Sequence, residues 1–595
     1  MSLFKPEKKL SILAALLLSA PFFSYPLVWK KIFVGIIPYW GLFQVLSQGV
    51  LGLIALAVLF LLPRRSAALV QCSRTRGLYL CAAAGMVVAV LQYFLFRTPV
   101  WHIFAAGFYF LLVPAGAVLS RQIKKWMVIY AFIWVIPFVI VFFTSFRFTG
   151  WLGNWNWNFT MLFFVAALLV YAIPKLHFYR KIQLVLAFAM LALGGMHIFL
   201  SELFPRGLLL GTAAATAGVI LLLLLPREKR SAAVTLLMFA GIAGFVLLLQ
   251  LFPEANDSRI QLWKGSLELA LSLPGGGLGI SPERFVGMIV PFLPEGYFLT
   301  PYAAGLHPHP HNEVLYYFIG YGFVGLVYWF FLLCAFVSGI CRRDRLGLFI
   351  SWGVLLLAFY GQLDVLLSNP VAGSWFLLGA GAVAGTGLPQ VKEKNIPLEK
   401  CWVTAGLLVL LLAAGFAVKS SAASYHAFCG NQGLFRKDAE KGMRHLQKSI
   451  AVMPAADTLY VAARSALFDF RSPDAALALL EKLRKEFVFD SYFHSYSLAG
   501  RAYAVKGELN SSLQCFKRET ALYPVSALAW GLRLSVEKEM KLPAAEIAET
   551  EARFKRNMEY RKLDLSEFPL LRRHPILDDC SPSMVRTRIK RQAWQ

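Results

Sequence analysis

The chain has 595 residues, of which 58% are apolar or aromatic, 15% are charged and the formal net charge is +26. A soluble protein with this charge would suggest nucleic-acid binding, but soluble chains are only about 45–50% apolar even when glycine is counted. Apolar runs of about 18–25 residues, each long enough to cross a hydrocarbon core of about 30 Å, exclude a soluble enzyme and a disordered chain and indicate an all-α, polytopic membrane protein.

Thirteen apolar segments read as membrane spans, so we expect a bundle of about 12–13 helices. The first follows MSLFKPEKKL and reads as a span rather than a signal peptide, because no convincing small-x-small cleavage site comes after it. The segments lie near residues 10–29, 43–62, 78–96, 100–119, 126–145, 159–174, 182–201, 207–225, 231–252, 313–340, 346–364, 371–388 and 401–419.

The distribution of Lys and Arg predicts the orientation of the bundle. With a cytoplasmic N-terminus, 22 of these residues fall on cytoplasmic segments and 8 on the opposite side up to residue 400. Positively charged loops stay in the cytoplasm. An odd number of spans then places the chain after about residue 420 outside the cytoplasm, which in a bacterial inner membrane is the periplasm.

One external loop, residues 253–312, is much longer than the others. Loops beyond about 12–15 residues are usually functional or disordered. This one is rich in aromatic and apolar residues, which argues against disorder. Residues 258–272 show helical periodicity, and Pro274 and the following glycines end the helix. We therefore expect an ordered cap on the external face of a transmembrane domain spanning residues 1–423.

Residues 424–560 contain a periodic pattern. Gly500, Tyr503, Phe516 and Pro524 lie at offsets 0, 3, 16 and 24, as in a tetratricopeptide repeat. Gly430, Leu446 and Pro454 repeat the offsets 0, 16 and 24, and Ala463, Ala475 and Leu479 form a degenerate copy at 0, 12 and 16. The alternative is an unrelated helical-hairpin domain. Residues 561–595 form a basic tail with no assigned role.

The eight cysteines show no CxxC spacing, so the sequence supports no zinc site or redox motif. Cys429, Cys515 and Cys580 lie in the exported part. A disulfide among the three is an open possibility that their spacing does not assign.

The spans contain few ionisable residues, which argues against a proton-coupled transporter. Polar groups gather instead on the external side. They include Arg206 in the turn SELFPRGLLLG, Arg259 at the start of the long loop, and three alternating histidines, His307, His309 and His311, that lead into the span at residue 313. No acid or cysteine joins the histidines at ligand spacing, so we expect no metal.

Together these residues suit a reaction on a polyprenyl-pyrophosphate-linked sugar. Arginine stays charged and presents a planar set of donors to phosphate oxygens. Negative charge grows on the pyrophosphate as the glycosidic bond breaks, so fixed positive charges stabilise the transition state more than the ground state. A histidine can accept the proton of the acceptor hydroxyl or hydrogen-bond the phosphates.

The order of these elements resembles the superfamily of O-antigen ligases, O-antigen polymerases and protein O-oligosaccharyltransferases. The resemblance covers roughly residues 180–385 and consists of short, degenerate motifs. They are Arg206-Gly207; Ser258-Arg259 with Trp263, Pro274, Gly277, Gly279 and Phe285; and His309-Pro310-His311-Asn312.

The resemblance implies transfer of glycan from undecaprenyl pyrophosphate in the periplasm, without a metal or other cofactor. His311 matches the catalytic histidine, and Arg259 and Arg206 match pyrophosphate-binding arginines. His309 is expected to assist in binding, and Asn312, Lys264 and Asp364 are further candidates. The sequence departs from the family pattern in having FPRG, where a small polar residue usually precedes the arginine, so Arg206 is less secure than His311.

The acceptor is not decided by these residues, because all branches share the donor chemistry. Ligation to lipid A-core is favoured, with protein glycosylation and polymerisation as alternatives and a lipid-linked sugar transporter as a different class. The repeats are expected to hold an acceptor or another protein partner, since solenoids present concave surfaces. Membrane lipid, and not nucleic acid, accounts for the basic charge.

Overall fold

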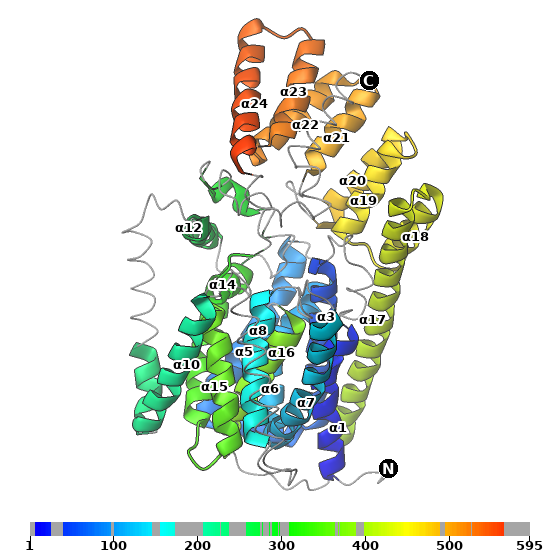
Figure 1. Cartoon of the computed structure of the whole chain (residues 1–595). Helices are drawn as coiled ribbons and strands as arrows, with labels where there is room; N and C mark the ends of the chain where they lie inside the picture. Colours follow the sequence, from blue (N-terminus) through cyan, green and yellow to red (C-terminus); the bar gives the residue numbers. More distant parts are fainter. Residues whose placement is uncertain are drawn as a thin grey trace.

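The computed structural model describes residues 6–24, 40–96, 100–144, 155–172, 206–226, 228–236, 258–273, 309–362, 369–387, 398–487, 494–524 and 526–564, with further positions at 277, 285, 288–294, 297 and 367. All regular elements in these ranges are helices. They form a bundle of apolar helices with a stack of helix pairs above one end (Figure 1).

The bundle contains eleven of these helices. They are α1 (Pro6–Ser24), α3 (Trp40–Leu61), α4 (Pro63–Gln71), α5 (Ser73–Phe96), α6 (Val100–Val118), α7 (Ser120–Thr144), α8 (Trp155–Ala172), α10 (Arg206–Leu224), α14 (Glu313–Gly339), α15 (Arg345–Tyr360) and α16 (Pro370–Ala384). The long helix α17 (Leu398–Phe435) flanks them (Figure 1).

Fewer helices meet the length of a membrane span than the thirteen predicted. In the described part of the chain, four are long and apolar enough to cross a membrane, or five if a bent pair counts as one span. Other apolar helices, such as α15 and α16, have only 10–17 residues and are shorter than a membrane span. The predicted span 182–201 lies outside the described residues. The structure therefore supports a membrane protein, while the full span count stays a prediction.

Glycines allow the bundle helices to approach closely. A Cβ added at Gly52 of α3 would lie 2.2 Å from the carbonyl oxygen of Phe104, on α6. Similarly, a Cβ at Gly381 of α16 would lie 2.1 Å from the carbonyl oxygen of Val113. Small residues at such crossings favour van der Waals packing between backbones, which drives helix association where no water is present.

Basic side chains bind helix ends at one end of the bundle. Arg74 donates to the carbonyl oxygens of Ala384 and Thr386, both at 2.8 Å, and Arg230 donates to the carbonyl oxygen of Ile340 at 2.6 Å. The last carbonyls of a helix have no partner inside the helix and carry partial negative charge, so cations stabilise them. We call this the basic end of the bundle; it also carries the N-terminal turn of α1.

The opposite end, which we call the repeat end, carries helix pairs formed by α17/α18, α19/α20, α21/α22 and α23/α24, and each pair also contacts the next. Their bounds are α18 (Ala439–Val452), α19 (Ala456–Phe468), α20 (Pro473–Phe487), α21 (Ser495–Val505), α22 (Leu509–Leu522), α23 (Ala527–Glu539) and α24 (Ala544–Asp564). α17 runs through residue 423, so one continuous helix joins the bundle to the stack.

The 16-residue offset seen in the sequence corresponds to contacts within these pairs. A Cβ at Gly430 would lie 2.7 Å from the Leu446 side chain, and one at Gly500 would lie 2.7 Å from Phe516. A small residue on the first helix of a pair thus receives a large residue from the second. Assignment of the stack to the tetratricopeptide family stays a prediction.

Apolar contacts hold the stack on the bundle. Trp101, at the start of α6, packs against a buried cluster formed by residues of α18, α19 and α20. Leu46 of α3 shares a buried cluster with Ala423 and Met453. The stack is therefore seated directly on the ends of α3 and α6.

The cysteine pairing left open by the sequence is partly resolved. Cys429 and Cys515 are both free thiols. They are therefore not bonded to each other, and Cys580 lies outside the described residues.

Replacing Gly52 tests the close packing of α3 on α6. Gly52→Ala forces these backbones apart, and overpacking of this kind costs about 1–3 kcal/mol. Gly415→Ala is the matched control on α17, because a Cβ there meets nothing within 4 Å. We expect thermal unfolding in detergent to occur at a clearly lower temperature for Gly52→Ala than for Gly415→Ala; equal melting temperatures would contradict the packing.

Candidate functional site

The helix expected at the start of the long loop is confirmed with the predicted bounds. α12 spans Ser258–Ser272. Leu262 and Leu269 are buried, at 1% and 0% exposure. Arg259, in its first turn, and Lys264 are exposed. α12 thus has an apolar face that packs inward and carries two cations on its accessible surface.

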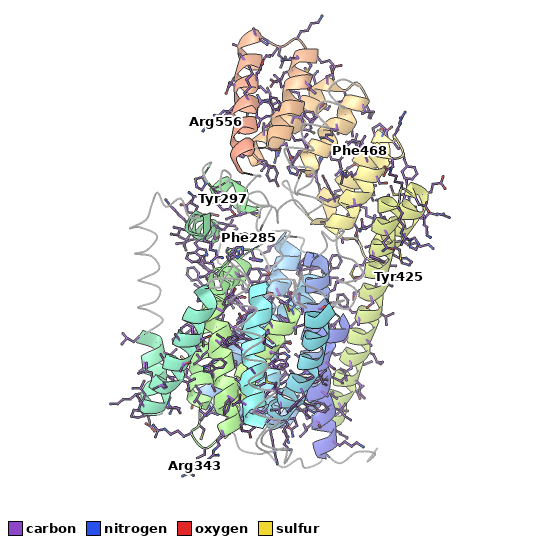
Figure 2. All side chains as sticks on the ribbon, viewed as in Figure 1. Phe285, Tyr297, Arg343, Tyr425, Phe468 and Arg556 are labelled. Carbon is purple, nitrogen blue, oxygen red and sulfur yellow. The ribbon has the colours of Figure 1, made fainter. Side chains whose placement is uncertain are left out.

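The apolar face of α12 belongs to a cluster that caps α14. Phe285 and Tyr297 from the loop pack there together with Phe318 and Ile319 of α14. Figure 2 shows Phe285 and Tyr297 beside α12, above the bundle. Burial raises the pKa of the Tyr297 hydroxyl well above its usual value, so this group stays neutral. Tyr523 of the helix stack joins the same cluster, which connects the loop to the repeat end.

A glycine of the predicted motif makes the contact between loop and span possible. Gly277 has φ +61°, and a Cβ added to it would lie 2.7 Å from the backbone nitrogen of Tyr321. Only glycine combines this backbone conformation with so close an approach. Next to Tyr321, α14 is interrupted at Gly322, whose φ is 60° and ψ −148°. The loop therefore rests on α14 beside its kink.

His309 and His311 lie together immediately before α14. Their ring centroids are 4.6 Å apart, in an edge-to-face arrangement with an interplanar angle of 70°. Both side chains are half-buried. His311 has φ +51°, a left-handed conformation that costs a residue with a Cβ roughly 1–2 kcal/mol. Such strain persists only where the surrounding structure fixes it, and it is concentrated at functional sites.

Asn312 is one of the contacts that fix this segment. Its side-chain oxygen accepts a hydrogen bond from the backbone nitrogen of Leu315 at 3.0 Å, so it caps α14. Its amide nitrogen donates to the carbonyl oxygen of Gln362 at 3.2 Å. The residue after His311 is thus bound both to its own helix and to the segment that follows α15.

Glu313 makes the second connection and was not among the residues predicted from sequence. It is 0% exposed. Its backbone nitrogen donates to the carbonyl oxygen of Gly361 at 2.8 Å, and its carboxylate accepts from the backbone nitrogen of Leu367 at 2.5 Å. An acid as the first residue of an apolar span is a detectable signal, because buried carboxylates need partners and favour helix N-termini.

Asp364 lies outside the described residues, whereas Gln362 before it and Leu367 after it are described. Gln362 and Leu367 are both hydrogen-bonded to the first residues of α14. Gln362 and Leu367 are therefore both fixed to the Asn312–Glu313 pair.

Arg206 is the first residue of α10, and its side chain lies outside the described residues. α10 packs along α15: a Cβ at Gly211 would lie 3.9 Å from the backbone nitrogen of Tyr360, the last residue of α15. Gly361, the next residue, bonds to Glu313. The N-terminus of α10 is therefore at the same end of the bundle as the histidines.

The structure thus brings His309, His311 and Asn312 together and carries Arg259 and Lys264 on the helix that packs against α14. Convergence of the Arg206 and Arg259 guanidinium groups on the imidazoles stays a prediction. In the ranges described, no group of three or more His, Cys, Asp or Glu side chains could hold a metal ion.

A cluster of tyrosines below this site was also missed. Tyr109 packs against Tyr316, Tyr317 and Tyr321, and each is 3% exposed or less. Gln48 donates to the Tyr109 hydroxyl at 2.7 Å. Tyrosine hydroxyls and the Gln48 amide therefore lie inside the bundle, where the tyrosine rings pack against one another. The spacing of 316, 317 and 321 on a helix was the available signal.

No protein-family model, no curated protein and no solved structure matches the chain.

Glu313→Ala tests whether this carboxylate fixes the segment after α15. The substitution leaves the backbone nitrogen of Leu367 without its acceptor, a loss of about 1–3 kcal/mol when the donor is buried. Glu313→Gln is the control, since its side-chain oxygen can still accept. We expect faster amide hydrogen exchange in peptides covering 361–372 for Glu313→Ala than for Glu313→Gln, and equal rates would exclude this role.

A second pair of variants tests the strained backbone at His311. His311→Gly and His311→Ala both remove the imidazole, but only Gly adopts φ +51° without a steric cost. The glycine variant should be more stable than the alanine variant by about 1 kcal/mol. Thermal unfolding of the two purified variants measures this difference, and a more stable alanine variant would argue against the left-handed conformation.

Proposed function

We propose that the protein is an O-antigen ligase-like glycosyltransferase that moves glycan from undecaprenyl pyrophosphate to an acceptor hydroxyl at the repeat end of the bundle. The observation that carries the proposal is the pair of His309 and His311 just before α14, with His311 in a left-handed backbone conformation, while Arg259 lies on α12, which packs against α14. Under the predicted orientation, this end faces the periplasm of a bacterial inner membrane.

In this reaction the acceptor oxygen attacks the anomeric carbon of the first sugar. The carbon–oxygen bond to the pyrophosphate breaks, and undecaprenyl pyrophosphate leaves with the bonding electrons. His311 takes the proton from the acceptor hydroxyl as general base. His309 lies edge-on to it at 4.6 Å between ring centroids and is assigned to binding of the phosphates rather than to proton transfer.

The leaving pyrophosphate needs cations that stay charged throughout the reaction. Arg259 is exposed on α12, where it can reach a lipid headgroup at the surface of the bundle. Arg206 begins α10, whose N-terminal turn adds the positive end of a helix dipole. Lys264 on α12 and the acid Asp364 are secondary candidates, for phosphate binding and for holding the histidine respectively.

The helix stack is assigned to the acceptor. Tyr523 of the stack and Leu262 of α12 belong to one buried cluster, so a molecule held by the repeats would be presented next to the donor loop. This contact suits a lipid A-core acceptor and equally keeps protein glycosylation open as the alternative, because helical repeats offer concave surfaces for polypeptides.

The proposal is tested by transfer assays with purified full-length protein, undecaprenyl-pyrophosphate-linked glycan, and either lipid A-core or a pilin-like protein as acceptor. We expect His311→Ala and Arg259→Ala to lower product formation at least about 100-fold, since each removes a group that acts in the transition state. Product on the protein but not on lipid A-core would establish the alternative acceptor.

Glu268→Gln and Arg343→Gln are the matched controls. Glu268 is exposed on α12, and Arg343 is exposed at the basic end, where it is labelled in Figure 2. Both controls should retain transfer close to that of the unaltered protein. Full turnover by His311→Ala and Arg259→Ala together would contradict the assignment of the site.

A further inference from the structure

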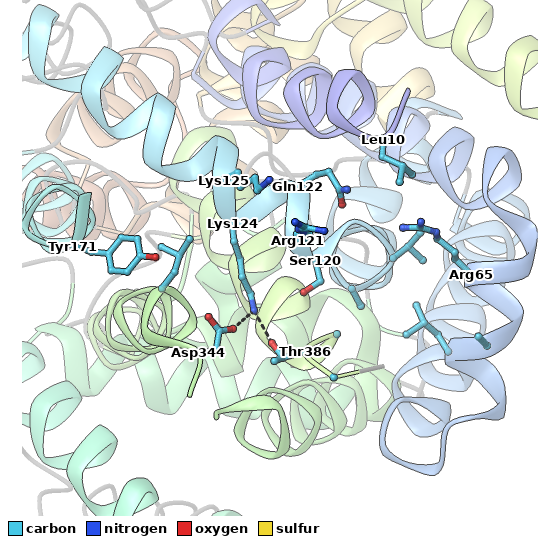
Figure 3. A pocket seen from close by; sticks show the side chains of 17 residues that line it. Leu10, Arg65, Ser120, Arg121, Gln122, Lys124, Lys125, Tyr171, Asp344 and Thr386 are labelled. Carbon is cyan, nitrogen blue, oxygen red and sulfur yellow. Dashed lines mark hydrogen bonds and ion pairs between the residues drawn. The ribbon is translucent and has the colours of Figure 1, made fainter. Parts of the chain in front are cut away.

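A cavity of about 440 Å³ opens at the basic end, far from the histidines. Figure 3 shows side chains from several bundle helices lining it. Its volume lies within the range of about 300–1,000 Å³ that is typical of ligand pockets. Its polar lining is dominated by cations, namely Arg65, Arg121, Lys124 and Lys125 against the single carboxylate of Asp344.

Lys124 and Asp344 neutralise each other. The Lys124 ammonium forms an ion pair with Asp344 and donates to the Thr386 hydroxyl at 2.7 Å, as drawn in Figure 3. The other oxygen of Asp344 accepts from the backbone nitrogen of Gly347 at 2.8 Å. This pair therefore joins α7, α15 and the end of α16, and it leaves the remaining three cations without a compensating charge in the cavity.

Arg65 gives the strongest indication of a ligand. Its Nε atom is buried and has no hydrogen-bond partner among the described residues. The residue as a whole is half-buried, so its guanidinium group can meet a ligand that enters the cavity. Arg121 and Lys125 are exposed side chains lining the same cavity. Among the described residues that line the cavity, these three cations face no carboxylate other than Asp344, and a cluster of cations around one space suits a phosphate group.

The lining also contains uncharged polar residues, such as Ser120 and Gln122, and an apolar part that includes Leu10, Leu69, Val118 and Leu346. A free inorganic anion gains nothing from such a surface. A phospholipid gains from both parts, because its phosphate meets the cations while its glycerol backbone and first acyl carbons cover the apolar residues. The cavity also lies at one end of the apolar helices, where the headgroups would meet a bundle that spans a membrane.

We propose that this cavity binds the headgroup of an anionic phospholipid of the phosphatidylglycerol type. The phosphate is placed between Arg65 and Arg121, with Lys125 at the rim, and the bound lipid links α4 to α7. This site lies at the opposite end of the bundle from His311, so the inference is independent of the proposed glycosyl transfer.

Lipid binding to the full-length protein in a neutral detergent tests the proposal. Phosphatidylglycerol should raise the melting temperature and saturate with added lipid. Phosphatidylcholine, and inorganic phosphate at equal concentration, should leave it unchanged. An equal shift with phosphatidylcholine would show that charge is not recognised, and an equal shift with inorganic phosphate would show that the site takes a free anion; either result overturns the proposal.

The double variant Arg65→Gln/Arg121→Gln should bind phosphatidylglycerol about tenfold or more weakly, as expected for the loss of two lipid-facing cations. Arg343→Gln is the control, because Arg343 is an exposed cation at the same end that does not line the cavity. Unchanged affinity in the double variant, or an equal loss in Arg343→Gln, would overturn the assignment to this cavity.

Photo-crosslinking to the unaltered protein tests the same site without a variant, and so applies even if the double variant does not fold. A phosphatidylglycerol probe with a diazirine near its headgroup should label peptides containing residues 63–71 and 120–126. The phosphatidylcholine analogue should not enrich the same peptides. Labelling of these peptides that is no stronger with phosphatidylglycerol than with phosphatidylcholine would overturn the proposal.

Discussion

Hydrocarbon cannot solvate a polar group, and this constraint governs where the charged side chains of the described bundle helices lie. The bundle is held by apolar contacts and by glycines such as Gly52 and Gly381, which let backbones touch. Charge is displaced to the two ends, where it has different partners. At the basic end, arginines bind helix C-terminal carbonyls. At the repeat end, α12 shares a buried cluster with α14 and with Tyr523 of the helix stack.

The start of α14 is the structural centre of the repeat end. Three hydrogen bonds from Asn312 and Glu313 attach it to the chain after α15, and Gly277 brings the loop onto its side. These contacts hold His311 in a left-handed conformation that it would not adopt alone. Under the proposed function, an imidazole held in this way would need no reorganisation before it accepts a proton.

Local patterns in the sequence predicted local structure well. Helical periodicity and Pro274 placed α12 at its observed bounds, and the 16-residue offset identified the pairs Gly430–Leu446 and Gly500–Phe516 that pack in the stack. The tertiary partners were not predictable in this way. Glu313 bonds to residues about 50 positions away, and Tyr109 meets tyrosines from α14. Local spacing in the sequence does not reveal which distant segments will meet. Of the thirteen predicted spans, the described residues contain four or five helices that could cross a membrane, and the predicted span 182–201 and most of 231–252 lie outside the described residues.

The predicted orientation places the two ends of the bundle on opposite sides of a membrane. Substituted-cysteine labelling tests it most directly, in a background without native cysteines and with a maleimide that cannot cross membranes. Lys264 and Glu481 are exposed at the repeat end, and Arg343 is exposed at the basic end. In spheroplasts, cysteines replacing Lys264 and Glu481 should react at once, and one replacing Arg343 only after lysis. Reaction of the 264 and 343 positions from the same side would contradict the account.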